Sequence, residues 1–85
     1  MANYNVSIKP SALKELEQIP KKDRLRVAER IRNLAIEPRP HGCQKLSGEE
    51  RYRIRQGVYR IIYSIEDQIR IVMIVKVVHR KEVYR

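Results

Sequence analysis

The segment RYRIRQGVYRIIYSIEDQIRIVMIVKVVHR, residues 51–80, decides the fold of this chain, because apolar and polar residues alternate along much of it. Such alternation is the pattern of a β-strand that buries one face. The pattern breaks at Gln56-Gly57, which suits a tight turn, and again at residues 66–68. We therefore predict three consecutive antiparallel strands, the last of which is apolar on both sides and needs cover on both.

The alternation also assigns the side chains of these strands to two faces. We place one set of tyrosines and isoleucines under helices: Tyr52, Ile54, Tyr59, Ile61, Tyr63 and Ile65. The opposite, uncovered face then carries Arg53, Arg55 and Arg60. In the last strand we expect Ile71, Met73, Val75 and Val77 to share one side, and Val72, Ile74 and Val78 to share the other. One of these sides has no helix to cover it, which predicts an apolar strip at a partner site.

The first half of the chain changes from a strand pattern to a helical one. Residues 4–8 alternate and predict a strand that joins the edge of the sheet. A helix begins at Pro10 and Ser11, carries Leu13 and Leu16 at helical spacing, and is stopped by Pro20.

A second helix begins near Asp23, and Pro38 and Pro40 end it. We expect its apolar stripe to be Leu25, Ala28, Ile31 and Leu34. Residues 37–50 are interpreted as a loop. The prediction is a single α+β domain over residues 1–85, in the order β-α-α-β-β-β, with a helical hairpin on one face of the sheet.

Composition bounds the partners of this domain. The chain has 85 residues, with 19 basic against 10 acidic ones, which leaves a charge of +9. Such an excess favours phosphate-rich or acidic partners. The longest apolar run contains Lys76 and is too short for a membrane span, and the first ten residues lack the pattern of a signal peptide. With a single cysteine, Cys43, to which we assign no role, we expect a cytoplasmic protein.

The chemical inventory excludes several classes of enzyme. His41, His79 and Cys43 are too few and not spaced as metal ligands, so we expect neither a metal nor another cofactor. Glycine-rich phosphate loops, nucleophile elbows and paired carboxylates are missing. What remains is the arginine face with His79, Arg80 and Tyr84, a combination that suits single-stranded RNA, since arginine binds phosphate and tyrosine stacks on bases.

Cleavage of RNA, unlike binding, requires groups that accept and donate protons. Arginines supply fixed positive charge but hold their protons too tightly for acid–base work. Histidine is the residue type that can exchange a proton near neutral pH, which makes His79 the first candidate for this work, and Lys45 is the weaker one. Most of the rate of such a ribonuclease would therefore come from positioning and charge.

The stretches KLSGEERYRIRQGVYRIIYSIED and IVKVVHRKEVYR resemble the RelE family of bacterial toxin–antitoxin toxins, in the RelE/ParE superfamily. The resemblance spans nearly the whole chain, including SALKELEQIPKKDRLRVAERIRNL as the helical hairpin. It implies a microbial-ribonuclease-like fold and an mRNA interferase that enters the A site of the 30S subunit and cleaves translated mRNA. Attack by the 2′-OH would leave a 2′,3′-cyclic phosphate and a 5′-OH. An antitoxin would wrap around the toxin in a hetero-oligomer.

The resemblance also implies roles for individual residues. Arg53 and Arg55 match the basic pair that binds the backbone and helps to activate the 2′-OH. Arg60 matches the ligand of the transition-state phosphate. Arg80 matches the arginine that aids the leaving group, a role for which His79 competes, and Tyr84 matches the tyrosine that stacks on the cleaved nucleotide. We add as RNA contacts Lys45, Arg51, Lys81 and Arg85.

Three departures and two alternatives remain. Some relatives carry lysines in place of Arg53 and Arg55, some use a histidine near the end, and some have a C-terminal helix that is missing here. A ParE-like toxin that poisons DNA gyrase would share the fold, although such chains generally lack the basic and aromatic set. A non-catalytic RNA-binding module is the other alternative. The basic residues of the second helix are interpreted as solvated, with contact to ribosomal RNA as the minor alternative.

Overall fold

The computed structural model describes residues 3–46 and 50–80. Its elements are β1 (Asn5–Ile8), α1 (Pro10–Glu17), α2 (Lys21–Asn33), β2 (Gln44–Lys45), β3 (Arg51–Gln56), β4 (Tyr59–Glu66) and β5 (Ile71–His79). The proline at the start of α1 occupies a position where its missing N–H costs nothing. In α2, Asp23 lies in the first turn while Arg30 and Arg32 lie in the last, which is the arrangement that the helix dipole favours.

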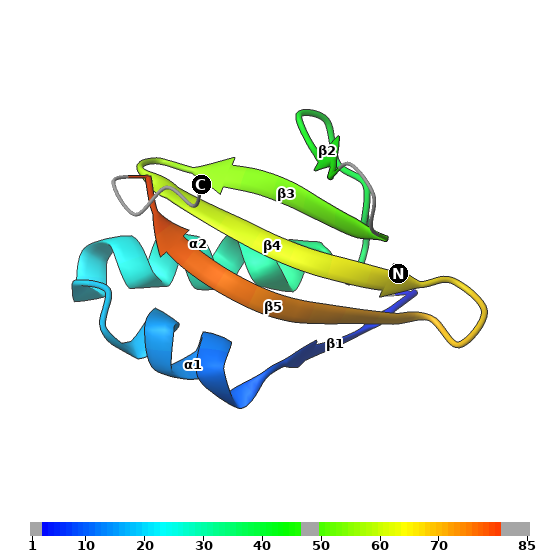
Figure 1. Cartoon of the computed structure of the whole chain (residues 1–85), viewed down its shortest axis with the longest axis horizontal. Helices are drawn as coiled ribbons and strands as arrows, with labels where there is room; N and C mark the ends of the chain where they lie inside the picture. Colours follow the sequence, from blue (N-terminus) through cyan, green and yellow to red (C-terminus); the bar gives the residue numbers. More distant parts are fainter. Residues whose placement is uncertain (1–2, 47–49, 81–85) are drawn as a thin grey trace.

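The strands form one sheet in the order β1-β5-β4-β3-β2. The predicted meander is confirmed, because β3, β4 and β5 pair antiparallel in sequence. The N-terminal strand lies at an edge as predicted, and it runs parallel to β5. The segment interpreted as a loop also contributes a strand, since β2 pairs with β3 at two positions. Both helices lie against the same face of the sheet (Figure 1).

The core fills the space between the helices and that face. The predicted tyrosine and isoleucine face is confirmed, because Tyr52, Ile54, Ile61, Tyr63 and Ile65 are buried and Tyr59 packs against them. The helical stripes were predicted only in part. Ala12 and Val27 are fully buried, whereas Leu13 is 43% and Leu25 59% exposed. The expected stripe of α2 was wrong at Leu25, because the helix is rotated so that Val27, Ile31 and Leu34 face the sheet.

Strand β5 departs from simple alternation at an irregularity of the ladder between Ile62 and Tyr63. Ile62 pairs with Lys76, but Tyr63 pairs with Ile74, so Val75 is the extra residue on β5. An extra residue of this kind reverses the alternation beyond it. The predicted sorting of β5 was therefore wrong: Val72, Ile74 and Val77 share the helix-covered side and belong to the core.

The same irregularity changes the apolar strip expected on the uncovered face. Val78 pairs with Arg60, and Met73 pairs with Ser64, so both belong to the side away from the core. Val78 and Ile62 are nevertheless buried, while Met73 and Ile71 are half-buried. Among the described residues, this strip is thus less exposed than the sequence predicted.

Within residues 3–46 and 50–80, the C-terminal half of β5 has no strand partner on one side, because β1 pairs only as far as Ile74. Glu15 of α1 closes part of this edge: the Val77 N–H donates a hydrogen bond to its carboxylate at 2.9 Å, and Lys76 forms an ion pair with it at 2.9 Å. The helix thereby holds the end of β5 in place and satisfies a backbone donor that would otherwise invite pairing with another chain.

Candidate functional site

A row of side chains crosses the uncovered face of the sheet near the β3–β4 turn. Arg60 on β4 pairs with Arg55 on β3 and with Val78 on β5. Their neighbours along the strands, Ile54 and Ile61, are buried in the core, so Arg55 and Arg60 lie on the side away from the helices. The predicted arginine face therefore has the geometry expected from alternation.

Arg80 joins this row through the backbone at the end of β5. Its N–H donates a hydrogen bond to the Val58 carbonyl at 2.7 Å, which ties the residue after the strand to the β3–β4 turn. The turn itself requires glycine, because Gly57 has a φ of +61°. The result is a hollow of about 160 Å³ lined by Arg55, Gly57, Val58, Tyr59, Arg60 and Arg80.

Arg60 lines this hollow from the middle of the three strands. Its Nε is buried and has no hydrogen-bond partner within residues 3–46 and 50–80. A buried donor left without a partner costs about 1–3 kcal/mol. A phosphate in the hollow would accept N–H bonds from the guanidinium groups that line it and would offset their charge. The arrangement is suited to binding an anion.

Arg53 lies two residues before Arg55 on the same face of β3. Its guanidinium contacts the Gln44 Oε1 of β2, the short strand that the sequence did not predict. Lys45 forms an ion pair with Glu50 at 3.6 Å, and Arg51 pairs with Ser64 towards the far end of the sheet. The structure thus places Arg53 near the arginine row, whereas Arg51 lies away from it. Tyr84, Lys81 and Arg85 lie outside the described residues.

His79 is separated from the arginines by the sheet. It pairs with Tyr59, whose side chain packs against the core, and the two rings meet edge to face at 5.3 Å between centroids. His79 also lines a hollow of about 190 Å³ formed with Glu15, Gln18, Ile19, Tyr59 and Val77. The expectation that His79 lies beside Arg53, Arg55 and Arg60 was therefore wrong, because the extra residue in β5 turns it towards α1.

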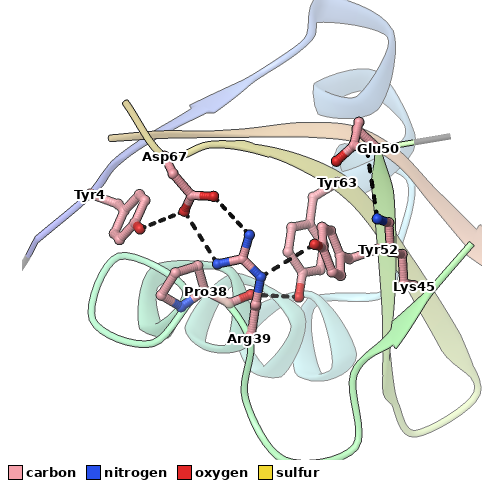
Figure 2. A network of polar contacts seen from close by, with 8 residues as sticks. All are labelled: Tyr4, Pro38, Arg39, Lys45, Glu50, Tyr52, Tyr63 and Asp67. Atoms are coloured by element: carbon pink, nitrogen blue, oxygen red, sulfur yellow. Dashed lines mark hydrogen bonds and ion pairs between the residues drawn. The ribbon is translucent and has the colours of Figure 1, made fainter. Parts of the chain in front are cut away.

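A second polar cluster, which the sequence did not reveal, lies at the other end of the sheet (Figure 2). Arg39 forms a bidentate ion pair with Asp67, with bonds of 2.9 and 3.2 Å, and its Nε donates to the Tyr52 hydroxyl at 3.2 Å. The Tyr4 hydroxyl donates to Asp67 at 2.8 Å. These contacts join the loop after α2 to β3, the β4–β5 turn and the start of the chain. Its members are 13 to 63 residues apart, so no local motif signals them.

Hydrogen bonding and burial shift the pKa values in and near this cluster. The bonds from Arg39 and Tyr4 hold the pKa of the Asp67 carboxyl below its usual range. The bond to Asp67 raises the pKa of the Tyr4 phenol, and burial raises that of Tyr63, whose hydroxyl donates to the Pro38 carbonyl at 2.8 Å. The cluster is therefore a structural clasp with a charged carboxylate at neutral pH.

The described part of the chain contains no group of three or more His, Cys, Asp or Glu side chains placed to hold a metal ion. Its helices are also too short and too polar to cross a membrane. The chemistry that the described site offers consists of the positive charge and hydrogen-bond donors of its arginines.

Comparison with known proteins agrees with this geometry. Residues 6–84 match the model of the family described as the ParE toxin of type II toxin–antitoxin systems. A protein of Methanocaldococcus jannaschii that bears the name of a toxin, RelE1, is 31% identical over 86 residues, which cover 96% of each chain.

Solved structures show the same fold. The chain resembles one in the archaeal RelE–RelB complex of Pyrococcus horikoshii with a TM-score of 0.84 and 32% identity, over 95% of this chain and 99% of that one. It resembles one in the toxin–antitoxin complex RelBE2 of Mycobacterium tuberculosis with a TM-score of 0.81 and 30% identity, over 92% and 99%. The chain therefore belongs to the RelE/ParE superfamily of toxins of type II toxin–antitoxin systems, and its fold is that of the RelE toxins.

Proposed function

We propose that this toxin is a ribosome-dependent, metal-independent endoribonuclease that cleaves translated mRNA in the A site of the 30S subunit. One observation carries the proposal: Arg55, Arg60 and Arg80, from three separate segments, surround one hollow, and the buried Arg60 Nε lacks a partner among the described residues. A solvated strand face would leave such a donor in water. The buried Nε indicates that the Arg60 side chain is held in place, and the guanidinium groups that line the hollow would bind a phosphate there.

Each arginine has a place in the proposed reaction. The 2′-OH gives up its proton to water and its oxygen attacks the adjacent phosphorus while the bond to the 5′-oxygen breaks. The departing 5′-oxygen takes up a proton from water, so the products are a 2′,3′-cyclic phosphate and a 5′-OH. Arg60 binds the phosphoryl oxygens where negative charge develops. Arg53 and Arg55 bind the backbone on the side of the attacking hydroxyl. Arg80 assists the departing 5′-oxygen, and we favour it over His79 because it lines the same hollow as Arg60.

The size of the site is consistent with help from the ribosome. Small-molecule pockets usually enclose about 300–1,000 Å³, whereas the hollow around Arg60 encloses about 160 Å³. It can surround a phosphate but not a whole nucleotide. A ribosome that holds the message in an extended conformation would orient the rest of the substrate. Correct orientation of the reacting groups can remove a large part of the activation barrier, and it matters more here because the site has few acid–base groups.

The proposal includes a protein partner and a cellular place. The similar solved chains come from RelE–RelB and RelBE2 complexes. We extend this to a cognate antitoxin that neutralises the present chain in a hetero-oligomer in the cytoplasm. Translation would stop when the antitoxin is lost.

One finding favours a second candidate function. The matching family model is named for ParE, so a toxin that acts on DNA gyrase remains the alternative. The arginine hollow supports RNA cleavage over that alternative, because action on gyrase does not require a ligand for a scissile phosphate. An RNA-binding module without chemistry would also use the arginines, but it would not cut.

Induction in bacteria separates these functions. The 5′ ends of messages are mapped after induction of the wild type, of Arg60→Ala and of Arg26→Ala, an exposed arginine of α2 that serves as the matched control. Codon-phased cuts in translated regions that vanish only in Arg60→Ala support the proposal. DNA damage with intact messages would support action on gyrase instead. Uncut messages without DNA damage would contradict both activities.

A further inference from the structure

A second basic hollow adjoins the one around Arg60, at the outer edge of β3. It encloses about 200 Å³ and is lined by Arg30, Gly42, Gln44, Arg53 and Arg55. None of these lining residues is acidic. Arg55 borders both hollows, so the two are neighbours around one residue. Positive charge without a local carboxylate favours an anionic ligand here as well.

Arg30 reaches this hollow from α2. Strand β2 pairs with β3 only at Tyr52 and Arg53, which leaves the following part of the β3 edge without a strand partner among the described residues. Arg30 uses this opening, because its Nη2 donates a hydrogen bond to the Arg55 carbonyl at 3.2 Å. A guanidinium carries five N–H donors, so Arg30 can make this bond and still offer donors to a ligand.

Arg53 is oriented by a contact with a different element, β2. Its guanidinium contacts the Gln44 Oε1, and Gln44 is its partner in the β2–β3 ladder. Two arginines from different elements are thus held by other groups before a ligand arrives. Ordering them in advance lowers the entropy that binding would cost.

We propose that this second hollow binds a backbone phosphate of the RNA next to the scissile linkage, with Arg30 as a binding residue. The inference rests on the function proposed above and adds a subsite to it. Guanidinium groups match phosphate oxygens in a bidentate geometry. A contact of this kind fixes the register of the strand and carries no sequence information.

The shared position of Arg55 favours RNA over an acidic protein segment. A strand that places one phosphate against Arg60 passes Arg55, and the adjoining hollow is then the place for the neighbouring phosphate. An acidic peptide would match the charge of this hollow, but its carboxylates need not also occupy the hollow around Arg60.

The test measures cleavage of a ribosome-bound message in which single linkages around the cut are replaced by neutral methylphosphonates. We expect one flanking replacement to slow the wild type about tenfold, as the loss of one charge-assisted contact would. Arg30→Gln should slow cleavage of the normal message by a similar factor, and the same replacement should then slow this variant by clearly less than it slows the wild type, because Arg53 still lines the hollow. Arg32→Gln, which changes the same charge on an exposed position of α2, should behave as the wild type.

Three results would overturn the inference. The first is that the fold-reductions in cleavage rate caused by Arg30→Gln and by each flanking methylphosphonate multiply when the two are combined. The side chain and the phosphate would then act independently. The second is that Arg30→Gln cleaves normally but loses its antitoxin in gel filtration, which would assign the hollow to the protein partner. The third is that the wild type cuts no message or that Arg60→Gln cuts as well as the wild type, which would overturn the proposed function itself. The effect of a methylphosphonate is the ratio of two cleavage rates measured with the same variant. A loss of stability in Arg30→Gln lowers both rates and leaves this ratio unchanged.

Discussion

Arg55 and Arg60 lie directly opposite each other across strands β3 and β4. Like charges in directly opposed positions of a sheet destabilise it. Arg80 and, through the second hollow, Arg30 and Arg53 add to the same region of positive charge. The fold gathers these cations in one region despite their mutual repulsion, which supports the proposed phosphate site over a surface selected for stability alone.

Replacement of Arg55 should therefore stabilise the free protein while it impairs the site. We expect Arg55→Gln to raise the free energy of unfolding by about 0.5 kcal/mol, measured by urea denaturation, and to slow cleavage of ribosome-bound message. Arg26→Gln makes the same change of charge on α2 and should alter neither quantity appreciably. A destabilised Arg55→Gln would contradict the view that the facing arginines repel each other.

The position of His79 predicts that it does not transfer a proton in the reaction. His79→Gln should retain nearly all activity, whereas a general acid or base would contribute about 10²–10⁴-fold. Arg80→Gln should lose about 10²-fold, the scale for one group that stabilises developing charge. Single-turnover cleavage rates of the two variants show whether His79 or Arg80 assists the leaving oxygen. A large loss of cleavage rate in His79→Gln, together with an altered pH dependence of that rate, would show that His79 takes part in proton transfer.

The clasp around Asp67 predicts a particular dependence of stability on acid. The pKa of this carboxyl is lowered in the folded state. Its contribution is therefore present above the ordinary carboxyl pKa of about 3.9 and is lost as the pH falls through the lower folded value. Thermal unfolding of Asp67→Asn should show a smaller loss of stability between neutral and strongly acid pH than the wild type. Glu37→Gln changes an exposed carboxylate in the segment after α2 and should leave the pH dependence of stability as in the wild type.

The contacts of Glu15 with the end of β5 predict that this residue stabilises the strand. Its carboxylate accepts the Val77 N–H and pairs with Lys76. Glu15→Ala should cost about 1.5–3 kcal/mol, the value of a hydrogen bond to a charged group, and should promote self-association through the opened edge. Glu15→Gln keeps an acceptor and should lose less. Equal stability of both variants and the wild type in urea would show that the clamp contributes nothing.

The fold was largely predictable from the sequence because its signals are local. Alternation in residues 51–65 fixed which side of β3 and β4 is buried, and prolines marked both helices. The rotation of α2 was not predictable, since Leu25 and Val27 are both apolar and only packing against the sheet decides between them. Strand β2 was missed because a strand of two residues has no period of its own.

The site was predictable to the extent that it follows the strand register. Arg55 and Arg60 share a face by alternation alone, and pairing then brings them together. His79 was misplaced because one extra residue in β5 reverses the alternation, and nothing in IRIVMIVKVV marks where that residue falls. The part played by Arg30 depends on how α2 lies over the β3 edge, and the charged face of a helix reads in sequence as solvated.

The measurement that tests the central claim most directly is cleavage of one ribosome-bound message by the purified chain, followed by analysis of the product ends. We predict a 2′,3′-cyclic phosphate and a 5′-OH, and a rate in Arg60→Ala that is lower by about 10²–10³-fold, while Arg26→Ala cuts normally. A message that stays intact, or that Arg60→Ala cuts at the wild-type rate, would contradict the account.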